Sequence, residues 1–183
     1  MTGWKDKRKV MQRYDLTVEM YEERYGEEQK AKYRSALENV NVTDSVVLDA
    51  GCGSGLFFSH AAAQAGMLVG VDISRKLLLK AKQQARPLRN VFVLQADADH
   101  LPFQDGSFVA VFAFTVLQNM PNSSETLNEL KRVAKIGGRL VVTGLKKAFS
   151  SNTFTAIIES TGLKLVSFIN DEDVKCYVAV LGT

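Results

Sequence analysis

A glycine-rich loop at residues 51–55 (GCGSG) is the part of this sequence best suited to bind a ligand. An apolar run at 46–50 precedes it and an alanine-rich segment at 56–65 follows, which predicts a strand, a loop and a helix. Glycines let the backbone turn sharply and approach a ligand closely, and a helix N-terminus just beyond supplies unpaired N–H groups. The loop lacks the Gly-x-Gly-x-x-Gly spacing of dinucleotide sites, and no Gly-Lys-Ser/Thr follows as in a P-loop. Neither of those two sites is therefore expected here.

Two acidic residues follow the next two predicted strands, Asp72 after the run 67–71 and Asp97 after the run 91–94. In an open α/β sheet the carboxyl ends of the strands meet at one edge, where such folds bind their ligands. A carboxylate after the second strand can accept hydrogen bonds from both hydroxyls of a ribose, and one after the third strand can accept from an adenine amine. A phosphate-free adenosine, with a charged amino-acid tail over the glycine loop, fits all three features.

The elements that must position these groups alternate between strands and helices. Strands are predicted at 46–50, 67–71, 91–94, 108–114, 140–143, 163–169 and 174–181. Helices are predicted from Gln12 to Asn39, divided in two by Gly26, and at 56–65, 74–85, 121–135 and 153–160. This alternation predicts an α/β fold with a parallel sheet covered on both faces. The last two strands are joined by a link too short for a crossover, so they must run antiparallel.

Length and composition are those of one globular domain. The chain has 183 residues, of which 46% are apolar and 23% charged. No apolar run approaches the roughly 18 residues of a membrane span, and no secretory signal is expected at the basic N-terminus. Cys52 and Cys176 are too few for a disulfide framework, so we expect a reduced, cytoplasmic compartment. Residues 1–40 are expected to form a basic arm and helices that cover the ligand site, and residues 41–183 the core.

Positive charge is concentrated near the N-terminus. The formal net charge is +3, and the segment 5–13 alone carries five cations and one aspartate, or +4, which leaves −1 for the remainder. A mobile arm with five cations could bind phosphates in a salt-dependent manner, which points to RNA. The alternative is a solvated terminus without a binding role.

In their order along the chain, these motifs resemble those of the class I S-adenosylmethionine-dependent methyltransferases. The resemblance covers roughly residues 46–181 and rests on four stretches, Val47–Gly55, Gly70–Ser74, Gln95–Phe103 and Leu130–Leu140. Within this family, the chain most resembles the branch that includes the ubiquinone and menaquinone biosynthesis methyltransferases. It implies a Rossmann-like fold with a seven-stranded, mostly parallel sheet, an antiparallel last strand and helices on both faces.

The resemblance also implies the cofactor and its contacts. The cofactor would be S-adenosyl-L-methionine, the product S-adenosyl-L-homocysteine, and no metal is expected. Asp49 and the glycine loop would receive the methionine end, Asp72 would hold the ribose, and Asp97 with Ala98 would contact the adenine edge. The complete set of expected cofactor-binding residues is Asp49, Ala50, Gly51, Cys52, Gly53, Asp72, Ile73, Asp97, Ala98, Phe114, Thr115, Tyr14 and Tyr21.

No catalytic residue is assigned from the sequence. Methyl transfer chiefly needs the acceptor and the methyl group to be aligned in a water-poor pocket, and a base only if the acceptor must lose a proton. The His pair that the family often carries beyond the fourth strand is replaced by Gln118-Asn119. His100 is either a base or a surface residue, His60 is expected to be structural, and Cys52 is not in the setting of a nucleophile.

Three functions stay open at this point. We favour methylation of RNA or of a translation-associated protein, because of the basic arm, the absence of an inserted substrate domain and the apolar third strand, Val91–Leu94. By the family's strand order that strand lies at a sheet edge, where a small zinc-binding activator subunit could add a strand, unless the edge is merely short. The alternatives are a small-molecule methyltransferase with a quinone-like or other metabolite acceptor, and a cofactor-binding module without catalysis.

Overall fold

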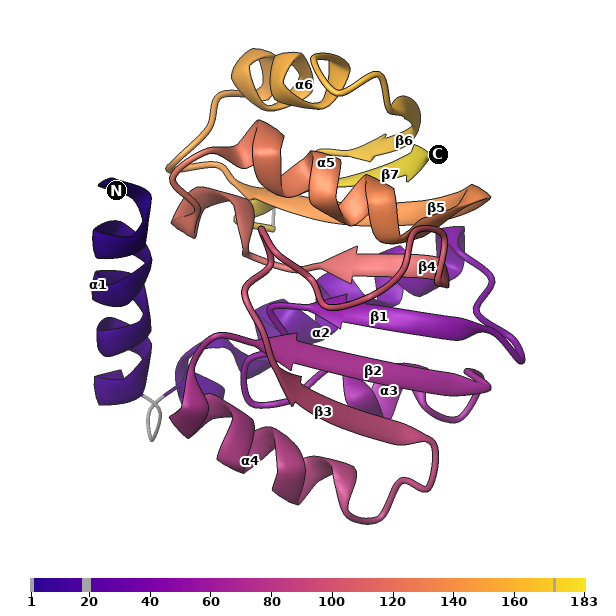
Figure 1. Cartoon of the computed structure of the whole chain (residues 1–183). Coiled ribbons are helices and arrows are strands. Elements are labelled where there is room, and N and C mark those ends of the chain that lie inside the picture. The colour runs from indigo at the N-terminus through magenta and orange to yellow at the C-terminus, as the bar shows by residue number, and fades with distance from the viewer. Residues whose placement is uncertain (1, 18–20, 173) are drawn as a thin grey trace.

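The computed structural model contains a single sheet of seven strands in the order β3-β2-β1-β4-β5-β7-β6 (Figure 1). It describes residues 2–17, 21–172 and 174–183, and the side chains of these residues except 2, 17 and 21–28. The strands are β1 (Val46–Ala50), β2 (Met67–Asp72), β3 (Val91–Gln95), β4 (Phe108–Ala113), β5 (Ala134–Leu145), β6 (Lys164–Ile169) and β7 (Cys176–Gly182). Neighbouring strands are parallel except where β7 pairs with β5 and β6. The predicted Rossmann-like α/β fold with an antiparallel last strand is confirmed.

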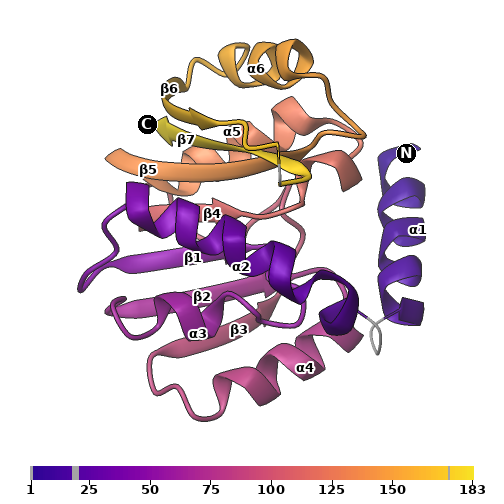
Figure 2. The same cartoon turned by 180° about the vertical axis from the view of Figure 1, so that it is seen from behind.

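Helices cover both faces of this sheet. Helices α2 (Tyr21–Asn39), α3 (Phe58–Ala61) and α4 (Arg75–Ala85) lie on one face, whereas α5 (Ser123–Val133) and α6 (Ser151–Glu159) lie on the other (Figures 1 and 2). Each face has a buried apolar core of its own, which includes Phe58 and Phe112 on the first face and Leu127 and Phe154 on the second. The two cores fix the strands, and with them the loops at their carboxyl ends.

Helix α1 (Thr2–Thr17) lies outside these layers, across the carboxyl ends of the strands (Figure 1). We predicted a mobile basic arm with a helix only from Gln12, and this is wrong, because the segment is helical from Thr2. Its lysines, arginines and glutamine are good helix formers, and Asp6 pairs with Lys9 one turn on.

Other predicted boundaries also need correction. Gly26 lies inside α2 rather than between two helices, since one glycine costs a helix only about 1 kcal/mol. The predicted helix at 56–65 shrinks to α3, and β5 already begins at Ala134, inside the range 121–135 predicted to be helical and before the Gly137-Gly138 pair. The register between β4 and β5 is irregular after Ala134, where these two glycines lie. Regular pairing of the two strands resumes at Arg139.

The connection from β3 to β4, residues 96–107, contains no helix and crosses the α5 side of the sheet (Figure 1).

Strand β3 lies at the edge of the sheet, as predicted. Phe92 and Leu94 pair in register with Val69 and Val71 of β2, which face the α5 core. Because no helix covers this end of the face, Phe92 is 53% and Leu94 42% exposed.

Candidate functional site

An open cavity lies at the carboxyl ends of β1 to β4 and against α1, and its empty space, including open solvent at its mouth, is about 660 Å³. The strand order reverses between β1 and β4, and such reversal points are where open α/β sheets bind ligands. The cavity is lined by Lys7, Val10, Tyr14, Gly51, Gly53, Asp72, Ile73, Leu77, Ala96, Asp97, Ala98, Phe114, Thr115, Val116, Asn119 and Met120. The fold therefore brings together nine of the residues expected from the sequence, Tyr14, Gly51, Gly53, Asp72, Ile73, Asp97, Ala98, Phe114 and Thr115. Their role in binding a cofactor stays a prediction.

The glycine loop presents bare backbone to this cavity. Gly51 has a φ of 76° and Gly53 a φ of 56°, conformations that residues with side chains rarely adopt. A Cβ at Gly51 would lie 2.4 Å from Cγ2 of Val116, so any side chain would collide with the opposite wall. The N–H groups of Gly51 and Cys52 donate to the carbonyl of Val71 at 2.8 and 2.9 Å, which ties the loop to the end of β2.

Asp72 lies at the cavity wall at the end of β2, as predicted. Its Oδ2 accepts from the N–H of Gly53 at 2.9 Å and its Oδ1 from the N–H of Ser74 at 2.7 Å. Burial raises the pKa of Asp72 to about 6, although these backbone hydrogen bonds lower it in part. The carboxylate is thus ionised at neutral pH and held in place, and each oxygen keeps a lone pair for a hydroxyl donor.

A second hollow of about 270 Å³ shares Gly51 and Phe114 with the first. Three buried polar atoms from its wall have no hydrogen-bond partner within the described part of the chain: Asp49 Oδ2, Ser54 Oγ and Gln29 Oε1. Buried polar atoms are nearly always paired, so these three atoms leave the hollow able to bind a polar group from outside the chain, whether of a water or of a ligand. Burial, with a smaller contribution from the charge of Asp72, raises the pKa of Asp49 to about 8.

Gln29 and Ser54 were missed by the sequence analysis. Ser54 is part of the glycine loop, and its position there is the signal that could have identified it. Gln29 comes from α2 and also donates through Nε2 to Thr115 Oγ1 at 3.4 Å. Nothing in the sequence around Gln29 distinguishes it from the other polar residues of that helix, so only the packing of α2 identifies it.

Thr115, at the end of β4, has a positive φ of 62°, which is uncommon for a residue with a branched side chain. Its N–H donates to Thr143 Oγ1 at 2.7 Å, and its carbonyl accepts from the side-chain amides of Gln118 at 2.6 Å and Asn119 at 2.9 Å. Asn119 also donates to the hydroxyl of Tyr14 at 3.1 Å. Backbone strain of this kind is found mainly at functional sites, and here side chains of α2, of β5 and of the segment after β4 contact Thr115.

Asp97 lies in the cavity wall but already has a partner. Both of its oxygens accept from the ammonium of Lys7 in α1, at 2.8 and 2.7 Å. Lys7 is itself buried, so this cation of the predicted basic arm is not available to phosphates in solution.

Of the remaining predicted residues, Asp49 and Cys52 line the second hollow, Ala50 lines neither cavity, and Tyr21 cannot be placed. Ala50 is buried at the end of β1. Cys52 is also buried, and burial raises the pKa of its thiol, which agrees with the expectation that it is not a nucleophile. The side chain of Tyr21 lies outside the described residues. His60 packs against Tyr33 at 5.3 Å between ring centroids, as expected for a structural residue.

The ionisable residues described in the wall of the main cavity are Lys7, Tyr14, Asp72 and Asp97, and none is a histidine. No group of three or more His, Cys, Asp or Glu side chains suited to a metal occurs in the described segments. Nor does any described helix combine the length and apolar character needed to cross a lipid bilayer.

A family model for a methyltransferase domain matches residues 48–142, just over half of the chain. The chain belongs to this methyltransferase family. The matched segment runs from β1 into β5 and so includes the glycine loop, Asp72, Asp97 and Thr115. The resemblance to class I methyltransferases recognised in the sequence is confirmed.

One curated relative is the demethylmenaquinone methyltransferase of Staphylococcus saprophyticus subsp. saprophyticus. It is 34% identical over 119 residues, which are 63% of this chain and 51% of the relative. The chain thus spans about half the length of the curated relatives it matches. The resemblance to the quinone-biosynthesis branch is confirmed as well.

Two solved structures show the same fold over nearly the whole chain. Magnesium protoporphyrin IX methyltransferase from Synechocystis PCC 6803, with bound S-adenosylmethionine, has a TM-score of 0.80 and 19% identity, and covers 97% of each chain. A putative methyltransferase in complex with the Haloferax volcanii Trm112 methyltransferase activator has a TM-score of 0.77 and 18% identity, and covers 92% of this chain and 96% of that one.

Proposed function

We propose that this chain transfers the methyl group of S-adenosylmethionine to a small organic acceptor, with quinone-like rings as the first class to test. The observation that carries the proposal is the group of three unpartnered polar atoms beside the glycine loop. An α-amino acid carries an ammonium, which can donate to Asp49 Oδ2 and Gln29 Oε1, and a carboxylate, which can accept from the Ser54 hydroxyl.

The residues present fit the rest of the cofactor. Asp72 would accept from the ribose hydroxyls, while Ile73 and Leu77 would contact the adenine face and Asp97 its amine. Thr115 would border the sulfonium. When bound, S-adenosylmethionine supplies an electrophilic methyl group, and the protein's own task is then to align an acceptor with that methyl and to exclude water.

The shape of the cavity favours a small acceptor. Val10, Val116 and Met120 give it apolar walls, and Tyr14 and Asn119 add two polar groups, a combination typical of small-molecule sites. Helix α1, which we had expected to reach RNA as a mobile arm, instead supplies part of this wall. The relatives that are named as demethylmenaquinone methyltransferases also support a quinone-like acceptor.

Binding and transfer are tested separately. Calorimetry with S-adenosylhomocysteine should show one site per chain, and Asp72→Ala should weaken binding by about tenfold or more, since a buried acceptor for two hydroxyls is lost. Absence of binding to the unaltered protein would exclude the proposal.

The acceptor class is then read by incubating the protein with methyl-labelled cofactor and a cell extract. Label in the lipid or metabolite fraction supports a small acceptor, and label in RNA or protein contradicts it.

A second candidate, methylation of RNA or protein with an activator subunit, is favoured by one observation. The apolar edge strand β3 is exposed at Phe92 and Leu94, and a solved structure with this fold is a complex with an activator. Co-expression with a small zinc-binding subunit should then yield a complex that Phe92→Lys disrupts. Val166→Lys, on exposed β6 at the other edge, is the matched control. No complex, or one that both substitutions weaken equally, counts against this candidate.

A further inference from the structure

Helix α1 is attached to the rest of the molecule mainly through a charged side chain. Among its described side chains, 3–16, Lys7 is the one that is buried, with 8% exposure. The large apolar residues Trp4 and Leu16 are 50% and 81% exposed. Ordinary surface helices bury an apolar stripe, whereas Val10 and Met11 of α1 are only half-buried, so Lys7 is the most deeply buried described side chain of this helix.

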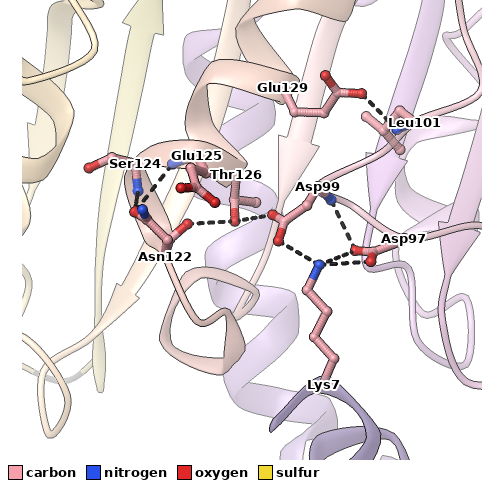
Figure 3. A network of polar contacts seen from close by, with 9 residues as sticks. All are labelled: Lys7, Asp97, Asp99, Leu101, Asn122, Ser124, Glu125, Thr126 and Glu129. Carbon is pink, nitrogen blue, oxygen red and sulfur yellow. Dashed lines mark hydrogen bonds and ion pairs between the residues drawn. The ribbon is translucent and has the colours of Figure 1, made fainter. Parts of the chain in front are cut away.

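Lys7 lies between two carboxylates of the β3–β4 connection (Figure 3). Its ammonium is 2.7 Å from Asp97 Oδ2, 2.8 Å from Asp97 Oδ1 and 2.5 Å from Asp99 Oδ2. Burial works against the charge of Lys7, but its hydrogen bonds and the charges of the two aspartates outweigh this and raise its pKa. Lys7 is therefore a cation at any physiological pH.

Further hydrogen bonds hold the two aspartates in place (Figure 3). The N–H of Asp99 donates to Asp97 Oδ1 at 3.0 Å, and Thr126 Oγ1 in the first turn of α5 donates to Asp99 Oδ1 at 2.5 Å. Asn122 caps the same helix by accepting from the N–H groups of Ser124 and Glu125. A continuous polar network thus runs from α1 through the cavity wall to α5.

This network leaves a defined place on Asp97 for a ligand. Each carboxylate oxygen can accept about two hydrogen bonds. Oδ1 accepts from Lys7 and from the Asp99 N–H, whereas Oδ2 accepts from Lys7 alone among the described contacts. Asp97 also lines the main cavity, so the free position on Oδ2 can receive a donor there.

We propose that Lys7 is a positioning residue of the cofactor site, which fixes the Asp97 carboxylate for the adenine amine and holds α1 over the cavity. The inference rests on the proposed binding of S-adenosylmethionine. One carboxylate then serves both contacts, so the position of α1 and the recognition of adenine are coupled. Without the ammonium of Lys7, Asp97 and Asp99 face each other with no cation between them, and the site no longer holds the amine acceptor in a fixed orientation.

Other described contacts also hold α1 in place. Arg13 and Tyr14 contact the side chain of Asn119, and Asp15 accepts from the hydroxyl of Ser74. These are hydrogen bonds to loops and helix starts, and the bond made by Arg13 is exposed. The ion pair of Lys7 is the contact whose loss leaves buried charge behind, and this makes it the dominant one.

The test is the affinity for S-adenosylhomocysteine, measured by calorimetry on the full chain. We expect Lys7→Met to weaken binding about tenfold or more, because one partner of a buried charge pair is lost. Lys7→Arg should restore most of the affinity. Lys5→Met, which removes an exposed lysine from the same helix, is the matched control and should leave binding unchanged.

A second probe separates positioning from a merely structural role. S-inosylhomocysteine has a carbonyl in place of the adenine amine, and the unaltered protein should bind it more weakly than S-adenosylhomocysteine. In Lys7→Met this preference should shrink, since Asp97 is no longer held for the amine. A structural defect alone would weaken both ligands in equal proportion and would overturn the proposal.

Two further outcomes are decisive. Unchanged binding of S-adenosylhomocysteine by Lys7→Met would also overturn the positioning role of Lys7. Tighter binding would overturn it too, because it would mean that Lys7 competes with adenine for Asp97. If Lys7→Met does not fold, the double variant Lys7→Met/Asp99→Asn removes the repulsion between the two aspartates, and the same expectations apply to it. Failure of the unaltered protein to bind S-adenosylhomocysteine contradicts the proposed function instead, whatever the variants do.

Discussion

Among the single residues of the site, those of the glycine loop expose backbone without side chains, and the nearby aspartates are buried, which disfavours their ionised form. Gly51 and Gly53 allow the loop to take left-handed conformations against the cavity. Asp49 is 2% exposed, with one oxygen unpartnered, and burial raises its pKa to about 8. The ionised form of such an acid destabilises the folded protein unless a cation of a ligand pairs with it. A strongly raised pKa of this kind is typical of residues at binding sites.

The titration of Asp49 predicts a pH dependence of stability. Its pKa rises from 3.8 to about 8 on folding, so the folded state holds the proton more tightly and stability falls as the pH rises across that window. Asp49→Asn cannot ionise, and we expect its free energy of unfolding without ligand to fall less steeply between pH 5 and 8. Asp49 alone should contribute a loss of roughly 1 kcal/mol for each pH unit within the window, and Asp72, whose pKa is raised to about 6, adds to the slope below pH 6 in both proteins. Urea unfolding at several pH values measures this, with exposed Asp44→Asn as control. Parallel profiles for Asp49→Asn and the unaltered protein would contradict the assignment.

Gly51 allows a second prediction at this scale. In Gly51→Ala the new Cβ would meet Val116 Cγ2 at 2.4 Å, so we expect S-adenosylhomocysteine binding to fall about tenfold or more as the loop shifts. Gly51→Ala/Val116→Ala should regain part of the affinity, because the collision is relieved. Gly137→Ala has a similar positive φ, 78°, but nothing within 4 Å of the added Cβ. Urea unfolding of Gly137→Ala therefore measures what the backbone strain alone costs in stability. Failure of Val116→Ala to improve the binding of Gly51→Ala would refute a role for the collision.

At the scale of elements, the β3–β4 connection needs an anchor because it lacks a helix. Arg132 of α5 provides one: it donates to the carbonyls of Phe103 and Leu101 at 2.8 and 3.0 Å, and to Asp105 at 2.6 Å. Glu129 accepts from the same guanidinium and from the N–H of Leu101. The hydrogen bonds to Glu129 and Asp105 raise the pKa of Arg132 further above its ordinary value. The connection that carries Asp97 is thus fastened to α5.

We expect Arg132→Lys to loosen this connection, since a lysine ammonium cannot match the fork geometry of the guanidinium. Stability should fall by about 1 kcal/mol, and backbone amides near Leu101 should exchange hydrogen faster. Hydrogen exchange read by mass spectrometry provides the measurement. Arg139→Lys, at an arginine with hydrogen bonds of 3.2 and 3.4 Å to Gly138 and Gly137, is the control and should leave that segment unchanged. Equal exchange in all three proteins would show that Arg132 is not the anchor.

At the scale of the whole molecule, the cavity unites elements from most of the chain. Strands β1 to β4 end at it, α1 lies across it and α2 contributes Gln29 to the adjoining hollow (Figure 1). A ligand bound there contacts both halves of the sheet, on either side of the point where the strand order reverses. It should therefore stabilise the fold as a unit.

Thermal unfolding tests this coupling. At a concentration of S-adenosylhomocysteine about 100 times its Kd, binding adds roughly 2.7 kcal/mol, and Tm should rise by roughly 5–10 °C for a chain of this size. Asp72→Ala should reduce the shift at the same ligand concentration. A transition that splits into two steps with ligand present would contradict a single cooperative unit.

Much of this molecule could be predicted from the residues. Apolar runs such as 46–50 and 108–114 identify buried strands, and the short link before β7 requires an antiparallel pair, because both depend on local pattern and chain geometry. The clustering of Asp72 and Asp97 with the glycine loop follows too, since parallel strands end at one edge of the sheet.

Fold class, the antiparallel closing pair and the place of the main cavity could be predicted from the residues, because hydrophobic periodicity and connection lengths act over short stretches of chain. The contacts of α1 with the cavity, the part played by Gln29 and the pairing of Lys7 with Asp97, 90 residues away, became apparent only in the folded molecule. Local propensity shows that a segment of lysines and arginines can be helical. Where such a helix lies depends on charges and cavities that exist only once the sheet has assembled, and no pattern within the segment encodes them.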